Sequence, residues 1–130
     1  MITKARSVGI YVTDQDRALA FYRDKLGFEV LSDIPMGEMG PPGHEDKRWI
    51  EVAPKGAETV FVLYTPPGAE DRVGGFSNVM WDTDDIEATH RALSEAGVEF
   101  TQEPTQQGWG IWAQFTDPDG NEFGLRQAPS

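Results

Sequence analysis

The sequence predicts an α+β protein built from two copies of one β-α-β-β-β module. A strand-like segment at 7–14 and a helix-patterned stretch that ends at Gly27 return as segment 78–85 and a second such stretch ending at Gly97. In both copies apolar residues alternate in the first segment and then recur at helical spacing. A repeat of this kind makes each copy one supersecondary unit. We therefore expect a pseudo-symmetric protein whose ligand site lies where the two copies face each other.

The first copy follows the strand-helix-strand pattern closely. Its expected elements are a strand at 8–12, a helix capped by Thr13 or Asp14 and ended by Gly27, and strands at 28–31, 49–52 and 59–65. Segment 34–46 is rich in proline and glycine, and we expect an irregular loop long enough to be a lid over a site.

The second copy has the same order of elements. A strand at 76–82 precedes a helix that Asp84 and Glu87 open as a capping box and that runs to Glu95. Strands are expected at 98–102, 110–116 and 122–126, the last two joined by the Pro- and Gly-containing turn at 117–121. The expected organisation is one domain, 1–130, with a first module at 5–66, a linker at 67–75 and a second module at 76–128.

Composition narrows the class of protein. The chain has 130 residues, of which 38% are hydrophobic and 25% charged, as in a globular domain. It lacks both an apolar run near the ~18 residues of a membrane span and a signal peptide, so a cytoplasmic protein without membrane contact is expected. The absence of cysteine excludes disulfides and thiolate metal sites. A net charge of −11 argues against nucleic acid as a partner and gives attraction for cations.

Three stretches resemble the vicinal oxygen chelate superfamily, also called the glyoxalase/bleomycin resistance/dioxygenase family. They are SVGIYVTDQDRALAFYRDKLGFEV at 7–30, WDTDDIEATHRALSEAGVEF at 81–100 and AQFTDPDGNEFGLRQ at 113–127. The resemblance covers nearly the whole chain, and the Asp-Pro-Asp-Gly-Asn turn is its most specific part. It implies two βαβββ modules that form a cupped mixed sheet around a cavity, usually in a homodimer. The family includes metal-dependent lyases, isomerases and dioxygenases as well as drug-sequestering proteins without metal, so function depends on the site.

The resemblance also implies where a metal would be held. In metal-binding members, the first and last strands of each module supply His or Glu ligands, and the matching positions here are Ser7, Val62, Asn78 and Gly124. The Val62 match leaves Leu63 or Thr65 as alternatives. None of the four matched residues is an effective ligand for a catalytic divalent ion, which needs imidazole or carboxylate donors. We therefore expect no metal cofactor.

Other potential metal ligands are few and scattered. His90 is expected mid-helix, facing solvent or the edge of the core, and His44 in a solvated cluster of loop charges with Glu45 and Asp46. Glu51 and Glu122 can hold magnesium weakly, but strand carboxylates more often pair with arginine. These residues do not change the expectation of a metal-free cavity.

Strand alternation predicts which side chains line the cavity. If the helices cover the apolar face of each sheet, the opposite, concave face presents aromatic, amide and charged groups. The residues expected to bind a ligand are Tyr11, Trp49, Glu51, Tyr64, Asn78, Met80, Trp109, Trp112, Gln114 and Arg126. Aromatic rings suit a flat ligand, and Arg126 can bind a carboxylate or phosphate. The tryptophans can equally close a collapsed cavity or a dimer interface.

Two functions follow from these residues. The favoured one is a metal-free protein of the bleomycin-resistance type that binds an aromatic or cationic small molecule, with no catalytic residue assigned. The alternative is an enzyme of the same superfamily, a lyase or dioxygenase, with a displaced metal set or none. A Ser-His-Asp order, a phosphate loop and a dinucleotide glycine pattern are all missing from the sequence.

Overall fold

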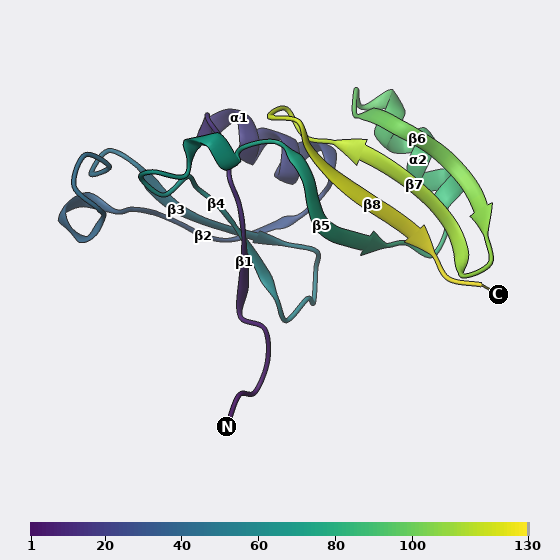
Figure 1. Cartoon of the computed structure of the whole chain (residues 1–130), viewed down its shortest axis with the longest axis horizontal. Helices are drawn as coiled ribbons and strands as arrows, with labels where there is room; N and C mark the ends of the chain where they lie inside the picture. Colours follow the sequence, from purple (N-terminus) through teal and green to yellow (C-terminus); the bar gives the residue numbers. More distant parts are fainter. Residues whose placement is uncertain (130) are drawn as a thin grey trace. The chain divides into compact units, whose positions relative to one another are not determined.

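A computed structural model describes residues 1–129 and divides the chain into two compact units, Met1–Val73 and a second that begins at Gly74 (Figure 1). Each unit is a β-α-β-β-β module with one four-stranded mixed sheet. The two sheets repeat the same strand order, β1-β4-β3-β2 in the first and β5-β8-β7-β6 in the second. The repeat in the sequence is therefore a repeat in the fold.

In the first unit, one helix lies over a sheet whose strands come from the whole first half of the chain. Its elements are β1 (Ser7–Ile10), α1 (Gln15–Ala20), β2 (Glu29–Pro35), β3 (Arg48–Ala53) and β4 (Val60–Leu63). α1 continues into a π-helical turn, Phe21–Lys25, before the chain returns as β2. β1 runs parallel to β4, while β3 is antiparallel to both of its neighbours.

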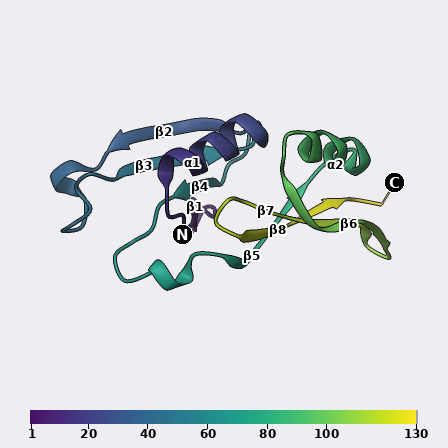
Figure 2. The same cartoon turned by 90° about the horizontal axis from the view of Figure 1, so that it is seen from above.

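The second unit follows the same plan with longer strands. Its elements are β5 (Gly75–Asp82), α2 (Ile86–Glu95), β6 (Glu99–Gln107), β7 (Gly110–Thr116) and β8 (Asn121–Gln127). α2 lies over the sheet near β6 and β8 (Figure 2). Asp117 organises the predicted turn before β8, since its carboxylate accepts from the backbone N–H groups of Asp119 and Asn121, at 2.9 Å each.

The helix caps confirm one sequence expectation and correct another. Asp14 caps α1 by accepting from Arg17 N at 3.0 Å. In the second unit the cap is Asp85, which accepts from Ala88 N at 3.0 Å, so the assignment of this role to Asp84 was wrong. The backbone of an N-cap residue is extended, and its side chain accepts a hydrogen bond from the backbone N–H three residues later. Asp85 meets both conditions.

The irregular loop expected at 34–46 is shorter than the sequence suggested, and its role as a lid stays a prediction. Ile34 and Pro35 belong to β2, where they lie opposite Trp49 and Arg48 of β3. The hairpin is extended by Met36 N, which donates to Lys47 O at 3.0 Å, and a short 3-10 turn follows at Gly37–Met39. Strand pairing thus continues farther than proline and glycine content indicates. β6 likewise runs to Gln107, beyond the expected strand at 98–102, because it pairs with β7 along its length.

Burial confirms the predicted faces best in the second unit. Ala113, Phe115, Phe123 and Leu125 are buried, whereas Met80 on the opposite face is exposed. In the first unit the expected apolar residues Ile50, Val52, Phe61 and Leu63 are also buried. Their neighbours on the other face, Glu51, Val62 and Tyr64, are buried as well, so strands β3 and β4 are covered on both sides.

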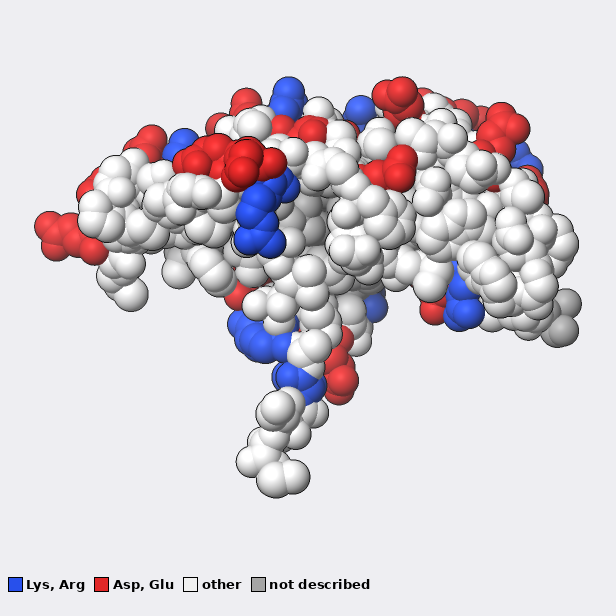
Figure 3. All heavy atoms as spheres, viewed as in Figure 1, with Lys and Arg blue, Asp and Glu red and all other residues white. Residues whose placement is uncertain are grey.

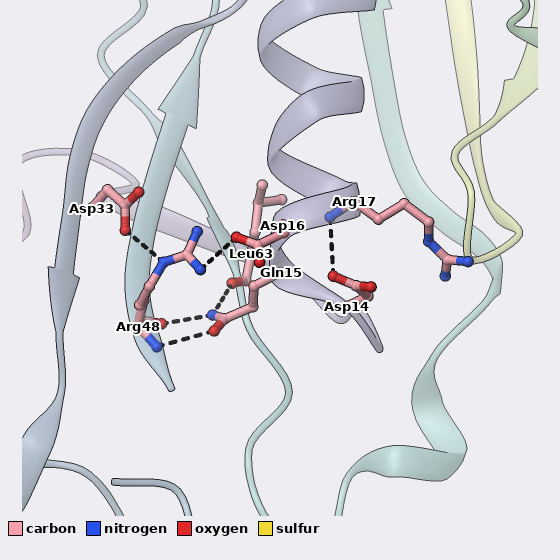
Figure 4. Close-up of polar contacts among 7 residues, drawn as sticks. All are labelled: Asp14, Gln15, Asp16, Arg17, Asp33, Arg48 and Leu63. Carbon is pink, nitrogen blue, oxygen red and sulfur yellow. Dashed lines mark hydrogen bonds and ion pairs between the residues drawn. The ribbon is translucent and has the colours of Figure 1, made fainter. Parts of the chain in front are cut away.

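The first sheet forks at one end. The register between β3 and β4 runs through Val52↔Phe61 and Glu51↔Val62 and stops there. Beyond that point the side-chain amide of Gln15 stands between the strands (Figure 4). Its Nε2 donates to the carbonyls of Arg48 at 2.6 Å and Leu63 at 2.9 Å, and its Oε1 accepts from Arg48 N at 3.0 Å. One amide therefore pairs with backbone groups of both strands beyond the point where their own pairing stops.

Each arm of the fork stays attached to its outer neighbour. On one arm Tyr64 N donates to Ile10 O at 3.3 Å, and the Thr65 hydroxyl donates to Val12 O, so the chain after β4 remains beside the chain after β1. On the other arm Arg48 pairs with Asp16 at 2.7 Å and with Asp33 at 2.9 Å. Hydrogen bonds to Asp16 and then Asp33 raise the pKa of Arg48, which keeps the positive charge fixed between the two carboxylates.

The second sheet has no corresponding fork along β7 and β8. These strands pair from Thr116↔Glu122 through Trp112↔Arg126 to Ile111↔Gln127. The residue that follows the helix cap is Ile86 here and Gln15 in the first unit. Ile86 cannot bridge strands with its side chain, and its backbone N–H donates to Gln127 Oε1 at 2.8 Å instead. The fork is therefore a feature of the first copy.

The surface is predominantly acidic, as the composition implies. Figure 3 shows acidic groups spread along the edges of this face, with smaller basic groups scattered among them and some at the N-terminal arm. Across residues 1–129, none of the helices is long and apolar enough to cross a membrane.

Replacing Gln15 with alanine should destabilise the protein by about 2–3 kcal/mol, because three hydrogen bonds to buried or partly buried backbone groups are lost. Chemical denaturation followed by circular dichroism measures this change. Gln107→Ala, at the exposed end of β6, is the matched control and should change stability little. Equal effects of the two substitutions would contradict the bridging role of Gln15.

Phe115→Ala should lower the free energy of unfolding by about 3–5 kcal/mol, since this ring is 1% exposed and packs against Phe100 and Phe123. Trp112→Ala, on the opposite face of the same strand, should cost less because the indole is only half-buried. Urea denaturation of both variants distinguishes the two faces. A large loss of stability in Trp112→Ala and a small one in Phe115→Ala would mean that the core face is assigned wrongly.

Candidate functional site

Three of the predicted ligand-binding residues lie together on β3 and just after β4. Trp49 Nε1 donates to Glu51 Oε2 at 3.0 Å, and the rings of Trp49 and Tyr64 lie 6.3 Å apart between centroids. Glu51 also pairs with Arg6 at 3.2 Å, as expected for a strand carboxylate. The charge of Glu51 is therefore compensated, and its role is to hold the indole of Trp49 in one orientation.

An apolar pocket of about 410 Å³ opens beside this cluster. It is lined by Ile34, Pro35, Met36, Met39, Gly40, Pro41, Trp49 and Tyr64. Met39 is 96% exposed and Trp49 is 37% exposed, so the pocket is accessible from solvent. Its volume suits a small organic molecule. Two flexible thioethers opposite two rings can adapt to flat ligands of different outline.

A second pocket, of about 350 Å³, lies in the fork of the first sheet. Its lining is Val12, Thr13, Gln15, His44, Lys47, Tyr64, Thr65, Glu70 and Val73. It is more polar than the first pocket and contains one basic and one acidic side chain, Lys47 and Glu70. Tyr64 lines both pockets, and therefore forms part of the wall between an apolar site and a polar one.

Tyr64 and His44 carry buried polar atoms without a hydrogen-bond partner, namely Tyr64 Oη and His44 Nδ1. Tyr64 is only 7% exposed, and burial raises the pKa of its hydroxyl. The two rings meet edge to face, with centroids 6.0 Å apart. His44 was expected in a solvated charge cluster, and this expectation was wrong because the ring turns inward onto Tyr64. Glu45, by contrast, folds back onto Gly43 N.

Tyr11 lies apart from these two pockets. The guanidinium of Arg72 stacks over its ring, 5.2 Å from the centroid. This cation–π contact ties the segment before the second unit to the end of β1. Tyr11 therefore has a structural role in the first unit, and its predicted role in ligand binding stays a prediction.

In the second unit, two of the predicted ligand-binding residues, Trp109 and Trp112, contact each other. Trp109 lies in the turn between β6 and β7, and its ring meets that of Trp112 edge to face at 5.3 Å. Trp112 lies over Gly124 so closely that a Cβ on residue 124 would come within 2.0 Å of Cη2 of the indole. Glycine at 124 is thus required to seat the tryptophan. Gln114 is the strand neighbour of Gly124 on β7.

The remaining predicted residues also lie in the second unit. Arg126 Nε pairs with Asp82 Oδ1 at 3.0 Å, so part of its charge is already compensated. Met80 is exposed and lies beside Gly124 in the ladder. Asn78 is exposed at a β-bulge with φ of 64°, a left-handed conformation that asparagine tolerates better than most residues. Asn78 therefore occupies an irregular part of β5.

The four positions at which metal-binding relatives hold their ion do not fit a metal here. Ser7, Val62 and Asn78 offer no imidazole or carboxylate, and the Gly124 position is filled by the Trp112 ring. Within the described 129 residues, no three His, Cys, Asp or Glu side chains come together as a metal-binding group. His90 packs against Phe100 at 4.5 Å, and Glu122 accepts from the Thr101 hydroxyl at 2.9 Å. Absence of a cofactor stays a prediction.

Sequence reasoning missed the residues that shape the two pockets, chiefly Gln15, Met36, Met39 and His44. A signal for Gln15 was present, because the repeat places glutamine where the second copy has Ile86. A polar residue at one of two equivalent sites marks a position where the copies have diverged. The methionines and His44 carried no such signal, since segment 36–47 has no clear counterpart in the second copy.

Comparison with known proteins assigns the chain to a family. Residues 4–125 match the Glyoxalase/Bleomycin resistance protein/Dioxygenase superfamily. The uncharacterized protein YetH of Bacillus subtilis (strain 168) is 38% identical over 98% of this chain and 100% of its own length.

Two crystal structures show the same fold. TnmS3, an antibiotic binding protein from Streptomyces sp. CB03234, is 37% identical with a TM-score of 0.77, over 98% of both chains. A superfamily member from Sphaerobacter thermophilus DSM 20745 is 36% identical with a TM-score of 0.82, over 97% of this chain and 98% of that one. The protein belongs to the Glyoxalase/Bleomycin resistance protein/Dioxygenase superfamily.

Proposed function

We propose that this protein binds a small aromatic organic compound, without a metal ion, and that the apolar pocket of the first unit receives the flat part of the ligand. The observation that carries this proposal is the pocket of about 410 Å³ formed by Trp49, Tyr64 and the methionines of the β2–β3 hairpin. TnmS3, which is similar to this protein over nearly the whole chain, is an antibiotic binding protein, and this similarity supports small-molecule binding as the class of function.

The electrostatics of the first unit favour neutral or cationic ligands over anionic ones. Glu51 beside the pocket is paired with Arg6, so the immediate lining is close to neutral. The protein as a whole carries a net charge of −11, which attracts cations at long range. Faces of Trp49 and Tyr64 can also bind a cation through their π electrons. An aromatic compound with a positive charge would use both effects.

The side chains at the family's ligand positions support the proposal that binding needs no metal. Hydroxyl, isopropyl and amide groups, with an indole over the fourth position, leave no donor set for a catalytic divalent ion. The protein would then sequester its ligand rather than transform it. The homodimer predicted from the sequence is part of this proposal.

Trp49→Ala should weaken binding of a planar aromatic compound at least tenfold, equivalent to about 1.4 kcal/mol, because the ring forms one wall of the pocket. A panel of cationic, neutral and anionic aromatic compounds can be titrated while tryptophan fluorescence is followed, with one saturable site per chain expected. Affinity for the cationic members should fall as salt rises.

Trp81→Phe is the control, because it also removes one fluorescent tryptophan but lies in the second unit, where it packs against Phe123. This variant should bind the aromatic compounds with the affinity of the wild type. If only anionic compounds bind, and Arg126→Ala abolishes their binding, the proposed ligand class and the proposed pocket are both wrong. The ligand would then be a carboxylate or phosphonate held by the second unit.

Divalent metal ions should not stabilise the protein. An ion present at a hundred times its dissociation constant would add about 2.7 kcal/mol to the free energy of unfolding, which shifts the melting temperature by several degrees. Thermal denaturation with micromolar excess of nickel or zinc, and without added metal, measures this shift. A rise that disappears in Glu51→Gln or His44→Ala would contradict the metal-free proposal.

A further inference from the structure

The polar pocket in the fork of the first sheet adjoins the apolar pocket at one shared residue, Tyr64. Where the second unit pairs Trp112 with Arg126, the first unit has Trp49 and Tyr64 on strands that no longer pair. The amide of Gln15 holds these strands apart through three hydrogen bonds. Tyr64 is the residue that lines both spaces. A ligand that enters the apolar pocket therefore meets the fork at Tyr64.

Two polar atoms at this boundary are buried and unpartnered. Tyr64 Oη and His44 Nδ1 have no hydrogen-bond partner, although the tyrosine is more than nine-tenths buried. Leaving a buried polar group unpaired costs about 1–3 kcal/mol. Two such groups on neighbouring rings require an explanation, and a ligand that pairs with both of them is one.

We propose that Tyr64 and His44 form a polar subsite that recognises a hydroxyl group at the end of an aromatic ligand. The ring of the ligand would lie in the apolar pocket and its hydroxyl in the fork, where it accepts from Tyr64 Oη and donates to His44 Nδ1. This inference rests on the proposed function and adds the chemical class of the ligand, a phenol-like aromatic compound. Binding would satisfy both unpartnered atoms at once.

The chemistry of the two groups supports a neutral hydroxyl over a carboxylate. Because burial raises the pKa of the Tyr64 hydroxyl, it stays protonated and remains a donor. Imidazole that carries its proton on Nε2 accepts at Nδ1. A hydroxyl is both donor and acceptor, and so complements this pair. A carboxylate offers no donor for Nδ1, and any attraction to Lys47 is opposed by Glu70 in the same pocket.

The test compares 2-naphthol with naphthalene, which has the same ring system without the hydroxyl. Equilibrium dialysis against wild type, Tyr64→Phe and His44→Phe gives the affinities without use of protein fluorescence. Tyr64→Phe keeps the ring and removes its one polar atom, whereas His44→Phe replaces the imidazole with a phenyl ring and removes both nitrogens. Each should weaken binding of 2-naphthol about fivefold to tenfold, the effect of one hydrogen bond, and leave binding of naphthalene unchanged. His90→Phe, on α2 against Phe100, is the control and should change neither affinity.

A second measurement distinguishes recognition from a structural role. Tyr64→Phe should leave the stability of the unliganded protein unchanged or raise it, because the substitution removes an unpaired buried hydroxyl. A fall in stability would show that the hydroxyl already has a partner, and would overturn the inference.

The outcomes also separate the inference from the proposed function. If both compounds bind and the two variants weaken both equally or neither, the polar subsite is wrong and aromatic binding stands. If neither compound binds wild type, the proposed function fails, and the inference fails with it. Loss of 2-naphthol affinity alone, in both variants, is the result that the inference requires.

Discussion

The side-chain amide of Gln15 is the interaction on which the shape of the first unit depends. An amide offers donors and an acceptor at fixed separation, and so can pair with backbone groups of two strands that no longer pair with each other. Gln15 uses this capacity between Arg48 and Leu63. Because it is the first residue of α1, directly after the cap Asp14, the helix start and the opening in the sheet are fixed by adjacent residues.

The two pockets follow from this opening. With β3 and β4 held apart, the β2–β3 hairpin is free to carry Met36 and His44 toward Tyr64, and the ring of Tyr64 is shared between an apolar space and a polar one. The second unit, whose strands stay paired to Gln127, seats Trp112 on Gly124 instead. The same module thus occurs twice, and its two copies differ both at equivalent positions, such as Gln15 and Ile86, and in the length of the hairpin that follows the second strand.

The order of elements was accessible from the sequence because it depends on local signals. Asp14 as a cap, Gly27 after the helix and the turn before β8 all act over a few residues, and the repeat let each copy support the other. The fork was not accessible, since Gln15 reads as an ordinary helical residue until its distant partners Arg48 and Leu63 are known. The inward orientation of the His44 ring was not predicted for a similar reason. Its neighbours Glu45 and Asp46 indicated solvent, whereas the ring follows the hairpin.

The candidate site divides in the same way. Strand alternation placed Trp49, Glu51 and Tyr64 on one face correctly, because adjacent strands bring such residues together whatever the rest of the chain does. It missed the methionines and His44, which reach the site from a segment without periodicity. Strand alternation also indicated that Arg126 can bind an anionic group of a ligand. The parallel ladder brings Asp82 opposite Arg126, and the two side chains pair.

The closure of every ladder within its own half of the chain affects how the protein is made. β1 joins β4 and β5 joins β8, so that each parallel pairing is completed inside one copy, and all the strand pairs described here obey this rule. Parallel pairing is slow when its partners are distant in sequence. During synthesis, the first sheet has all its strands once the segment after Leu63 has left the ribosome. The first sheet can then form before the second copy has fully emerged, which shortens the time in which an incomplete sheet is exposed to other chains.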